Sequence, residues 1–415
     1  MKRAVVVGSG AREHALAWRL ASSADVVVTP GNAGIAAHGI ACVDVPATEL
    51  EADLFVIGPE APLVDGLADR LRAQGKVVVG PGIDGARLEG SKAYMKEFLT
   101  AAGVPTARYG SFSDVEAALA FLAAMAPPYV VKTDGLAAGK GVLVTNDLDA
   151  ARADVAEKLS GSAFGAAGTT VVIEEGLVGE ECSLLYLCDG AAATALAPAQ
   201  DFKRVGDGDA GANTGGMGAY APMDAARGAI ETEVRERIIE PTLAELTRRG
   251  IDFRGVLYAG VMLTAAGPKL LEYNVRFGDP ETEAIMAVVD GDLFEALATI
   301  GRGEGAPAVA SAGYAVTVVV ASPGYPERPR TGGVIEGLSP DGQLASPLEG
   351  VVIFHAGTAR DDAGRFVTAG GRVLAITATG PSIDAARRLA YEASARVTFE
   401  GMVMRTDIAA AVSGS

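Results

Sequence analysis

Cysteine, histidine and tryptophan are scarce in this sequence of 415 residues, which contains three cysteines, three histidines and one tryptophan. Cys42, Cys182 and Cys188 show neither the spacing of a zinc site nor a disulfide framework. The three histidines, at positions 14, 38 and 355, are scattered along the chain, and we therefore expect no zinc site from them. This cysteine usage fits a reducing compartment, so we expect a cytoplasmic protein.

Positive charge is also in deficit, because 35 basic residues stand against 52 acidic ones and the net charge is -17. Such a surface repels nucleic acid and anionic membranes, so neither is expected as a partner, and an anionic ligand requires a local basic pocket. The uncharged stretch 305–326 is interrupted by glycines and prolines, and its central part predicts a buried strand instead of a membrane span. The N-terminus, MKRAVVVGSG, runs directly into a strand, so we expect no signal peptide.

A chain of this length exceeds a single hydrophobic core, and about three domains are expected. Up to about residue 90, short apolar runs alternate with helical patterns, which predicts a parallel sheet with helices between its strands. We place the N-terminal α/β domain at residues 1–96. The last part of the chain, residues 315–415, is rich in strand patterns with one helix and predicts a small β-rich domain after a linker.

Local signals between these two parts predict individual elements. One helix begins after Ser91 and ends at Gly103, which are typical capping residues. The next helix begins at Ser113, where Glu116 completes a capping box. Residues 200–222 are polar and rich in glycine, and we expect a long loop there that is either functional or disordered.

Residues 130–144, VVKTDGLAAGKGVLV, place glycines and lysines between two strand-like runs. Only three residues separate Gly135 from Gly139, and Gly141 follows Lys140 where a P-loop has serine or threonine. The segment therefore predicts a hairpin. It is either a flap whose backbone N–H groups lie over a phosphate or an ordinary flexible hairpin tip.

The N-terminal stretch VVVGSGAREHALAWRL has the strand, glycine turn and helix of a nucleotide-binding fold. Glu13 replaces the third glycine of the dinucleotide fingerprint, and no acidic residue ends the second strand, which argues against a dinucleotide-dependent oxidoreductase. Gly8 and Gly10 still open a helix N-terminus beside Arg12, which suits a single phosphate. The alternative is a tight turn with a solvated Arg12.

The stretch KLLEYNVRFGDPE is the strongest candidate for a metal site. Alternate residues of a strand share a face, so Glu272, Asn274 and Arg276 are predicted to point the same way. Carboxylate and amide oxygens suit a hard cation such as Mg²⁺ together with phosphate oxygens, and Arg276 can hold a carboxylate or phosphate. A strand with one solvated polar face is the alternative.

Three lysines and an acidic turn complete the candidates. Lys132 ends a strand, and Lys92 and Lys96 share one helix face, although single lysines are common on surfaces. The segment VIEEGLVGEECSL has acidic residues on both sides of a glycine turn, which either accept hydrogen bonds from adenine and ribose or are solvated.

In this order, the motifs resemble the ATP-grasp superfamily. The stretches GSGAREHALAW, GPEAPLVDGLAD, DGLAAGKGV, NTGGMGAYAP and EYNVRFGDPE are similar to the glycinamide ribonucleotide synthetase family, over essentially the whole chain. The resemblance implies a multidomain α/β and α+β fold, with an ATP-grasp domain of two α+β lobes at 97–303 and a lid lobe at 120–190. It also implies that ATP, glycine and 5-phosphoribosylamine give glycinamide ribonucleotide, ADP and phosphate through glycyl phosphate, with Mg²⁺ or Mn²⁺ as cofactor. We expect a monomer or weak dimer.

The resemblance also implies roles for individual residues, with Arg276 and Lys132 acting in the chemistry. The residues expected to bind ATP are Lys96, Lys132, Gly135, Gly139, Lys140, Gly141, Glu174, Leu177 and Glu181. Those expected to bind the phosphoribosyl group are Gly10, Arg12, Glu13 and Glu60, and those expected to bind glycine are Asn213, Thr214, Gly215, Gly216 and Arg276. The expected metal ligands are Glu272 and Asn274.

Two rival interpretations remain open on the sequence. Another ATP-grasp carboxylate–amine ligase would share the ATP residues but not GSGAREH together with NTGGMGAYAP. A module that binds ATP without chemistry would not need the pair Glu272 and Asn274.

Overall fold

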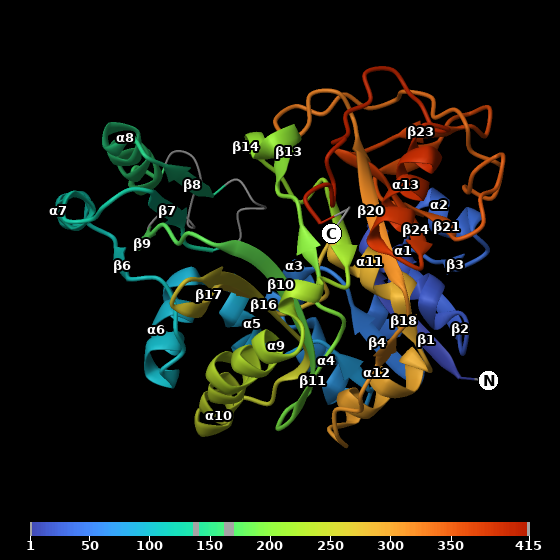
Figure 1. The fold of residues 1–415 in the computed structure, drawn as a ribbon. Coiled ribbons are helices and arrows are strands. Elements are labelled where there is room, and N and C mark those ends of the chain that lie inside the picture. Colours follow the sequence, from blue (N-terminus) through green and yellow to red (C-terminus); the bar gives the residue numbers. More distant parts are fainter. Residues whose placement is uncertain (1, 136–140, 162–169, 413–415) are drawn as a thin grey trace.

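The computed structural model describes residues 2–135, 141–161 and 170–412. Its N-terminal part is a five-stranded sheet in the order β3-β2-β1-β4-β5, with every neighbouring pair parallel, as predicted (Figure 1). The middle residues of β1, β2 and β4 are apolar and buried, which is typical of a parallel sheet covered on both faces. The strands are β1 (Arg3–Gly8), β2 (Asp25–Pro30), β3 (Ala41–Cys42), β4 (Leu54–Ile57) and β5 (Val78–Val79).

Helices connect these strands and lead into the middle of the chain. They are α1 (Ala11–Leu20), α2 (Ala33–Ala37), α3 (Glu60–Val64), α4 (Leu67–Ala73), α5 (Ile83–Gly90) and α6 (Lys92–Ala102). The predicted caps of α6 are confirmed, because the Ser91 side chain accepts a hydrogen bond from the N–H of Tyr94 and Gly103 is left-handed.

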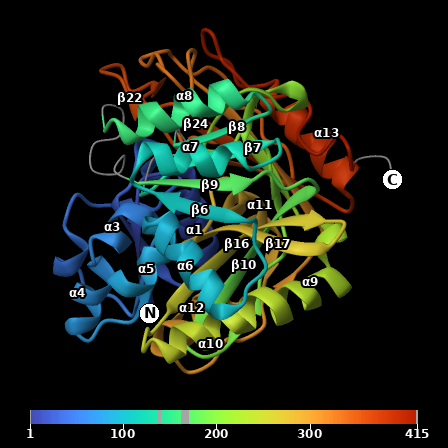
Figure 2. The same cartoon turned by 90° about the vertical axis from the view of Figure 1, so that its left-hand side faces the viewer.

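The lid lobe is a four-stranded antiparallel sheet, in the order β6-β9-β7-β8, covered by two helices (Figure 2). Its elements are β6 (Tyr109–Phe112), α7 (Val115–Ala123), β7 (Tyr129–Thr133), β8 (Val142–Thr145), α8 (Leu148–Leu159) and β9 (Val171–Glu175). The pairing of β7 with β8 confirms the predicted hairpin. The predicted cap of α7 is wrong by one residue, because the Asp114 side chain accepts the hydrogen bond from Ala117.

The second lobe is also an antiparallel sheet, in the order β11-β10-β16-β17. Its strands are β10 (Glu180–Asp189), β11 (Ala193–Ala195), β16 (Arg254–Thr264) and β17 (Gly267–Asn274). The register places Glu272 opposite Gly260 and Leu270 opposite Val261, so Leu271 is an extra residue in a bulge. Because β17 ends at Asn274, Arg276 does not continue the strand face as predicted.

Three helices accompany this lobe, α9 (Ala229–Val234), α10 (Glu240–Arg248) and α12 (Leu293–Arg302). Helix α11 (Glu281–Val288) packs instead against α1. A π-helical turn, Arg235–Ile239, joins α9 to α10, in which Pro241 is the second residue.

The C-terminal part is β-rich, as predicted, but its sheet is not built from the end of the chain alone. The sheet order is β12-β15-β20-β24-β21, and its first two strands come from residues 200–222, where we expected a long loop. The strands are β12 (Gln200–Asp201), β15 (Gly218–Ala221), β20 (Tyr314–Ala321), β21 (Val351–His355) and β24 (Arg372–Gly380). Helix α13 (Ile383–Ser394) packs on β20 and β24.

Three short two-stranded ribbons are also present among the described residues. They are β13 (Arg204–Gly206) with β14 (Ala210–Asn213), β18 (Val289–Asp290) with β19 (Ala310–Ser311), and β22 (Thr358–Arg360) with β23 (Phe366–Thr368). Since β19 pairs with β18, the predicted linker includes an ordered strand. The uncharged stretch 305–326 contains β20, and none of the described helices is long and apolar enough to cross a membrane.

The hydrophobic cores show how these parts are joined. Two large clusters each combine residues of β1, β10 and β20, so the N-terminal sheet, the second lobe and the C-terminal sheet pack together. The lid lobe has a smaller core of its own, which includes Leu122, Val131, Val155 and Ile173. The lid lobe projects from the rest of the molecule (Figure 1).

Candidate functional site

Two lysines and a glutamate form a buried cluster at the base of the lid lobe. Lys96 comes from α6, Lys132 from β7 and Glu174 from β9. The Lys96 Nζ atom lies 2.9 Å from Glu174 Oε2, and the Lys132 Nζ atom lies 3.0 Å from Glu174 Oε1. The structure therefore brings together both lysines predicted to contact phosphate. It also shows that the Glu174 side chain, which was predicted to lie at adenine, bridges these lysines.

The pKa values of the three charged groups in this cluster are shifted in different directions. Burial lowers the pKa of Lys96 to about 8, and the attraction of Glu174 offsets only part of that effect. Burial also acts on Lys132, but Glu174 and Glu272 outweigh it and raise the pKa of Lys132. The pKa of Glu174 is lowered because the two lysines outweigh the effect of its burial. An anion that arrives here meets two cations that share a single carboxylate.

The predicted metal ligands lie on β17 next to this cluster. Burial would raise the pKa of Glu272, but Lys132, Lys203 and Lys92 outweigh it and lower the pKa. No described residue donates a hydrogen bond to the Glu272 carboxylate, whereas Asn274 Oδ1 accepts one from Arg276 Nη2 at 3.2 Å. An ionised carboxylate beside an amide oxygen fits Mg²⁺ or Mn²⁺.

The described residues contain no group of three or more acidic, histidine or cysteine side chains that could hold a metal ion by themselves. A cation at Glu272 and Asn274 would therefore need ligands from a bound phosphate or from water. Mg²⁺ is commonly bound in this way, through one or two protein oxygens plus phosphate oxygens.

The connection from β9 to β10 carries the remaining predicted nucleotide contacts. Leu177 lies between the two strands and is half-buried. Glu181, at the start of β10, forms an ion pair with Lys203, whose Nζ atom also lies 2.9 Å from Asp201 Oδ1. Lys203 was missed in the sequence because it stands in a stretch without regular periodicity. Its place beside Glu181 depends on the bridge between Ser183 and Ala199, which brings this stretch against β10.

The two described ends of the glycine hairpin, Gly135 and Gly141, are each held by a hydrogen bond. The carbonyl of Gly135 accepts a hydrogen bond from Lys92 Nζ at 3.0 Å, and that of Gly141 accepts one from the N–H of Thr133 at 2.8 Å. Gly139 and Lys140, also predicted to bind ATP, lie outside the described residues.

The N-terminal loop is organised by Glu13. The Gly10 N–H donates to Glu13 Oε2 at 2.6 Å, and Arg12 Nε donates to Glu13 Oε1 at 2.5 Å. Arg12 Nη1 also donates to the carbonyl of Phe277 at 3.2 Å. A Cβ atom at Gly58 would lie 2.1 Å from Glu13 Oε1, so the carboxylate occupies the space left by that glycine. The glutamate that replaces the third glycine of the fingerprint thus closes the turn at the start of α1.

Arg276 connects the N-terminal loop with the metal ligands. Its guanidinium lies 3.5 Å from Glu60 Oε2 and 3.0 Å from Glu89 Oε1. The pKa of Glu60 is lowered because Arg276 outweighs the effect of burial, whereas burial raises the pKa of Glu89 despite Arg276. Sequence reasoning missed Glu89, because a glutamate near the end of α5 carries no signal for a contact with the segment after β17.

The predicted glycine loop is held by side chains from the C-terminal part. Arg372 Nη1 donates to the carbonyl of Gly215 at 2.7 Å, and the Gly215 N–H donates to the Tyr325 hydroxyl at 3.1 Å. Thr214 Oγ1 accepts from the N–H of Gly216 at 2.9 Å. Asn213 ends β14 directly before this loop.

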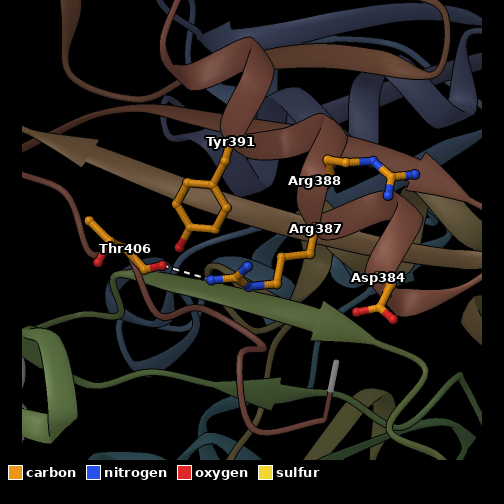
Figure 3. A pocket seen from close by; sticks show the side chains of 5 residues that line it. All are labelled: Asp384, Arg387, Arg388, Tyr391 and Thr406. Carbon is orange, nitrogen blue, oxygen red and sulfur yellow. Dashed lines mark hydrogen bonds between the residues drawn. The ribbon is translucent and has the colours of Figure 1, made fainter. Parts of the chain in front are cut away.

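A separate cavity of about 520 Å³ lies beside α13 (Figure 3). It is lined by Asp384, Arg387, Arg388, Tyr391 and Thr406, and none of the predicted site residues contributes to it. Arg387 donates 2.8 Å hydrogen bonds to the carbonyls of Thr406 and Ile408, so its guanidinium fixes the C-terminal segment.

Family models cover nearly the whole chain. The phosphoribosylglycinamide synthetase ATP-grasp (A) domain matches residues 90–282, and the N and C domains of the same enzyme match residues 2–89 and 315–411. The phosphoribosylamine–glycine ligase of Caulobacter vibrioides is 46% identical over 419 residues, with 97% of each chain covered. That of Streptomyces coelicolor is 46% identical over 428 residues, with 100% of each chain covered.

Solved structures extend the comparison. The crystal structure of phosphoribosylamine–glycine ligase from Thermotoga maritima has a TM-score of 0.85 and 36% identity, and covers 98% of this chain and 100% of its own. The biotin carboxylase domain of Hydrogenobacter thermophilus 2-oxoglutarate carboxylase has a TM-score of 0.72 at 17% identity, over 97% of this chain and 91% of its own, and shares the fold alone. On the full-length identity and the three matching domains, this chain belongs to the phosphoribosylamine–glycine ligase family of ATP-grasp enzymes.

Proposed function

We propose that this chain joins glycine to 5-phosphoribosylamine and gives glycinamide ribonucleotide, ADP and phosphate, through a glycyl phosphate intermediate. Full-length membership of the family supports the overall reaction. The structural observation that carries the proposal is the position of Lys96, Lys132 and Glu272 around one site, where the two lysines share Glu174. A triphosphate bound there would replace Glu174 as the partner of both cations.

In the proposed mechanism, the glycine carboxylate attacks the γ-phosphate of ATP, and the sugar amine then displaces phosphate from the acyl carbon. Lys96, Lys132 and Arg276 would neutralise charge on the phosphoryl group in transit. The cation held by Glu272 and Asn274 would supply further charge neutralisation to the phosphates. The glycine hairpin of the lid lobe would cover the phosphates and exclude water, which protects an acyl phosphate from hydrolysis.

The finer assignments belong to the same proposal. Gly135, Gly139, Lys140, Gly141, Leu177 and Glu181 would complete the ATP site. Gly10, Arg12, Glu13 and Glu60 would bind the phosphoribosyl group, and residues 213–216 would bind glycine. The domain limits 1–96, 97–303 and 315–415 belong to the same proposal, and the separate core of the lid lobe supports its place as a unit. The limits 120–190 expected for this lobe do not match its sheet, which begins at β6 and ends with β9, because β10 belongs to the second lobe. A cytoplasmic location and a monomeric or weakly dimeric state are proposed from composition and family.

Oxygen transfer tests the reaction and its route together. Glycine labelled with ¹⁸O in its carboxylate is incubated with ATP, Mg²⁺ and enzymatically generated phosphoribosylamine, and the products are analysed by mass spectrometry. One labelled oxygen should leave on inorganic phosphate, with ADP as the nucleotide product. Label in AMP, or none in phosphate, contradicts the acyl phosphate route. Product formed only with another amine or another carboxylate would favour a different ATP-grasp ligase.

A further inference from the structure

Asp279, Glu283 and Arg372 form a cluster that has no role in the mechanism above. Arg372, at the start of β24, places Nη2 2.9 Å from Asp279 Oδ2 and Nη1 3.1 Å from the Asp279 carbonyl. Glu283 lies in the first turn of α11, is fully buried, and finds no hydrogen-bond partner among the described residues for either carboxylate oxygen. A buried carboxyl group without a donor is costly and calls for an explanation.

The cluster lies between the two predicted substrate loops. A Cβ atom at Gly10 would be 3.8 Å from Asp279 Oδ2, so this carboxylate borders the loop predicted to bind the phosphoribosyl group. On the other side, Arg372 donates to the carbonyls of Gly215 and Gly216, in the loop predicted to bind glycine. The amine of one substrate and the acyl group of the other must meet between these loops.

The protonation of Glu283 explains its missing donor. Burial and the neighbouring Asp279 carboxylate raise the pKa of Glu283 well above its usual value, and Arg372 does not cancel their effect. A protonated Glu283 is itself the donor, and the adjacent Asp279 carboxylate can accept its proton in a hydrogen bond. Asp279 is then held from two sides, by Arg372 and by Glu283.

We propose, on the basis of the function proposed above, that Asp279 accepts the proton released when the amine of phosphoribosylamine attacks glycyl phosphate, and that Glu283 and Arg372 position it. In this step the amine lone pair forms the C–N bond, and the bond from the acyl carbon to the phosphate oxygen breaks. Phosphate leaves with that electron pair, and the nitrogen loses one proton to the Asp279 carboxylate. A positioned general base of this kind accelerates a step by roughly 10²- to 10⁴-fold.

Single-turnover rapid-quench kinetics separate this step from the activation of glycine. Asp279→Asn is compared with wild type in the presence of ATP, Mg²⁺, glycine and phosphoribosylamine, and ADP and ligation product are measured in the same samples. We expect ADP to form within about threefold of the wild-type rate and the product to form roughly 100-fold more slowly or worse. Asp290→Asn, at an exposed position of β18, is the matched control and should change neither rate.

Two outcomes overturn the role of Asp279. One is product formation at the wild-type rate, and the other is an equal slowing of ADP and product in a variant whose thermal unfolding matches wild type. If wild type itself makes no product from these substrates, the proposed function fails. That result is distinct from the two outcomes that overturn the role of Asp279.

Glu283 is tested as a positioning residue by a conservative rescue. Glu283→Ala removes one of the two donors to Asp279 and should slow product formation at least about tenfold, whereas Glu283→Gln restores an N–H donor and should recover most of the loss. A Gln variant as slow as the Ala variant would show that Glu283 does not act as a proton donor to Asp279.

Discussion

Acid should destabilise this protein through three histidines that are distant in sequence and adjacent in the fold. His14 Nε2 lies 2.9 Å from His38 Nδ1, and His14 Nδ1 accepts a 2.9 Å hydrogen bond from the backbone N–H of His355. His355 Nε2 lies 2.8 Å from the Gly342 carbonyl, and its Nδ1 lies 3.0 Å from Thr358 Oγ1. Nδ1 of His14 must accept, so its Nε2 carries the proton. Nε2 of His355 must donate, so both rings fit this network in the neutral form.

The environment of the cluster opposes protonation. Burial lowers the pKa of His355 to about 4, and His38 and Arg360 reinforce the effect. Burial also lowers the pKa of His14 well below its usual value, with further contributions from His355 and His38. The pKa of His38 is lowered by burial as well, against the opposing charge of Asp341. The unfolded chain therefore takes up protons at a higher pH than the folded chain, and stability is lost as the pH falls below about 6.5.

The expected loss follows from these pKa values. For His355, a shift from 6.5 to about 4 costs the folded state about 2 kcal/mol between pH 7 and pH 5. Urea unfolding at pH 7 and pH 5 gives the free energy of unfolding of wild type and of His355→Gln. The change between the two pH values is then compared between the two proteins. We expect the loss of unfolding free energy between pH 7 and pH 5 to be smaller in the variant by about 2 kcal/mol, whatever its stability at pH 7. An equal loss in the two proteins would refute the reasoning.

Two further predictions concern the ATP site. Glu272→Ala should lower kcat on the order of 10²-fold or more at ordinary Mg²⁺, because it removes an ionised metal ligand. The control Glu349→Ala, at an exposed position, should leave kcat unchanged. Steady-state ADP release measures both, and near-normal turnover of Glu272→Ala would exclude Glu272 as a ligand. The pKa of Lys96, about 8, predicts that kcat/KM for ATP falls as the pH rises through 8, because the free enzyme loses a cation that the triphosphate needs; a flat profile up to pH 9.5 would contradict that role.

Local patterns were sufficient to predict much of the fold. The strands of the N-terminal sheet, the caps of α6 and the β7–β8 hairpin each depend on residues close in sequence, such as Ser91 and Gly103. The assignment of β12 and β15 failed for the opposite reason. The whole of β15, Gly218–Ala221, pairs with β20, which lies almost a hundred residues later, and no local pattern records that pairing.

The candidate site shows the same division. Residue types and spacing indicated Glu272 and Asn274, and the family resemblance added Lys96 and Lys132. The fold places Glu272 close to both lysines. The bridging role of Glu174 and the contact of Glu89 with Arg276 require the relative positions of different strands and helices, which spacing along the chain does not give. The three histidines look scattered in the sequence because they lie in α1, just after α2 and in β21, and only the fold brings them together.

The sheet that β15 shares with β20 has a consequence for synthesis on the ribosome. The chain emerges from its N-terminus, so β15 is complete long before Ala315, the partner of Ala221, has been made. Until then β15 presents an unpaired edge that can join a strand of another nascent chain. A chain truncated after α12 would keep this edge permanently, because every strand that covers it lies beyond residue 313. The nascent protein thus depends on its last hundred residues to close a sheet begun in its middle.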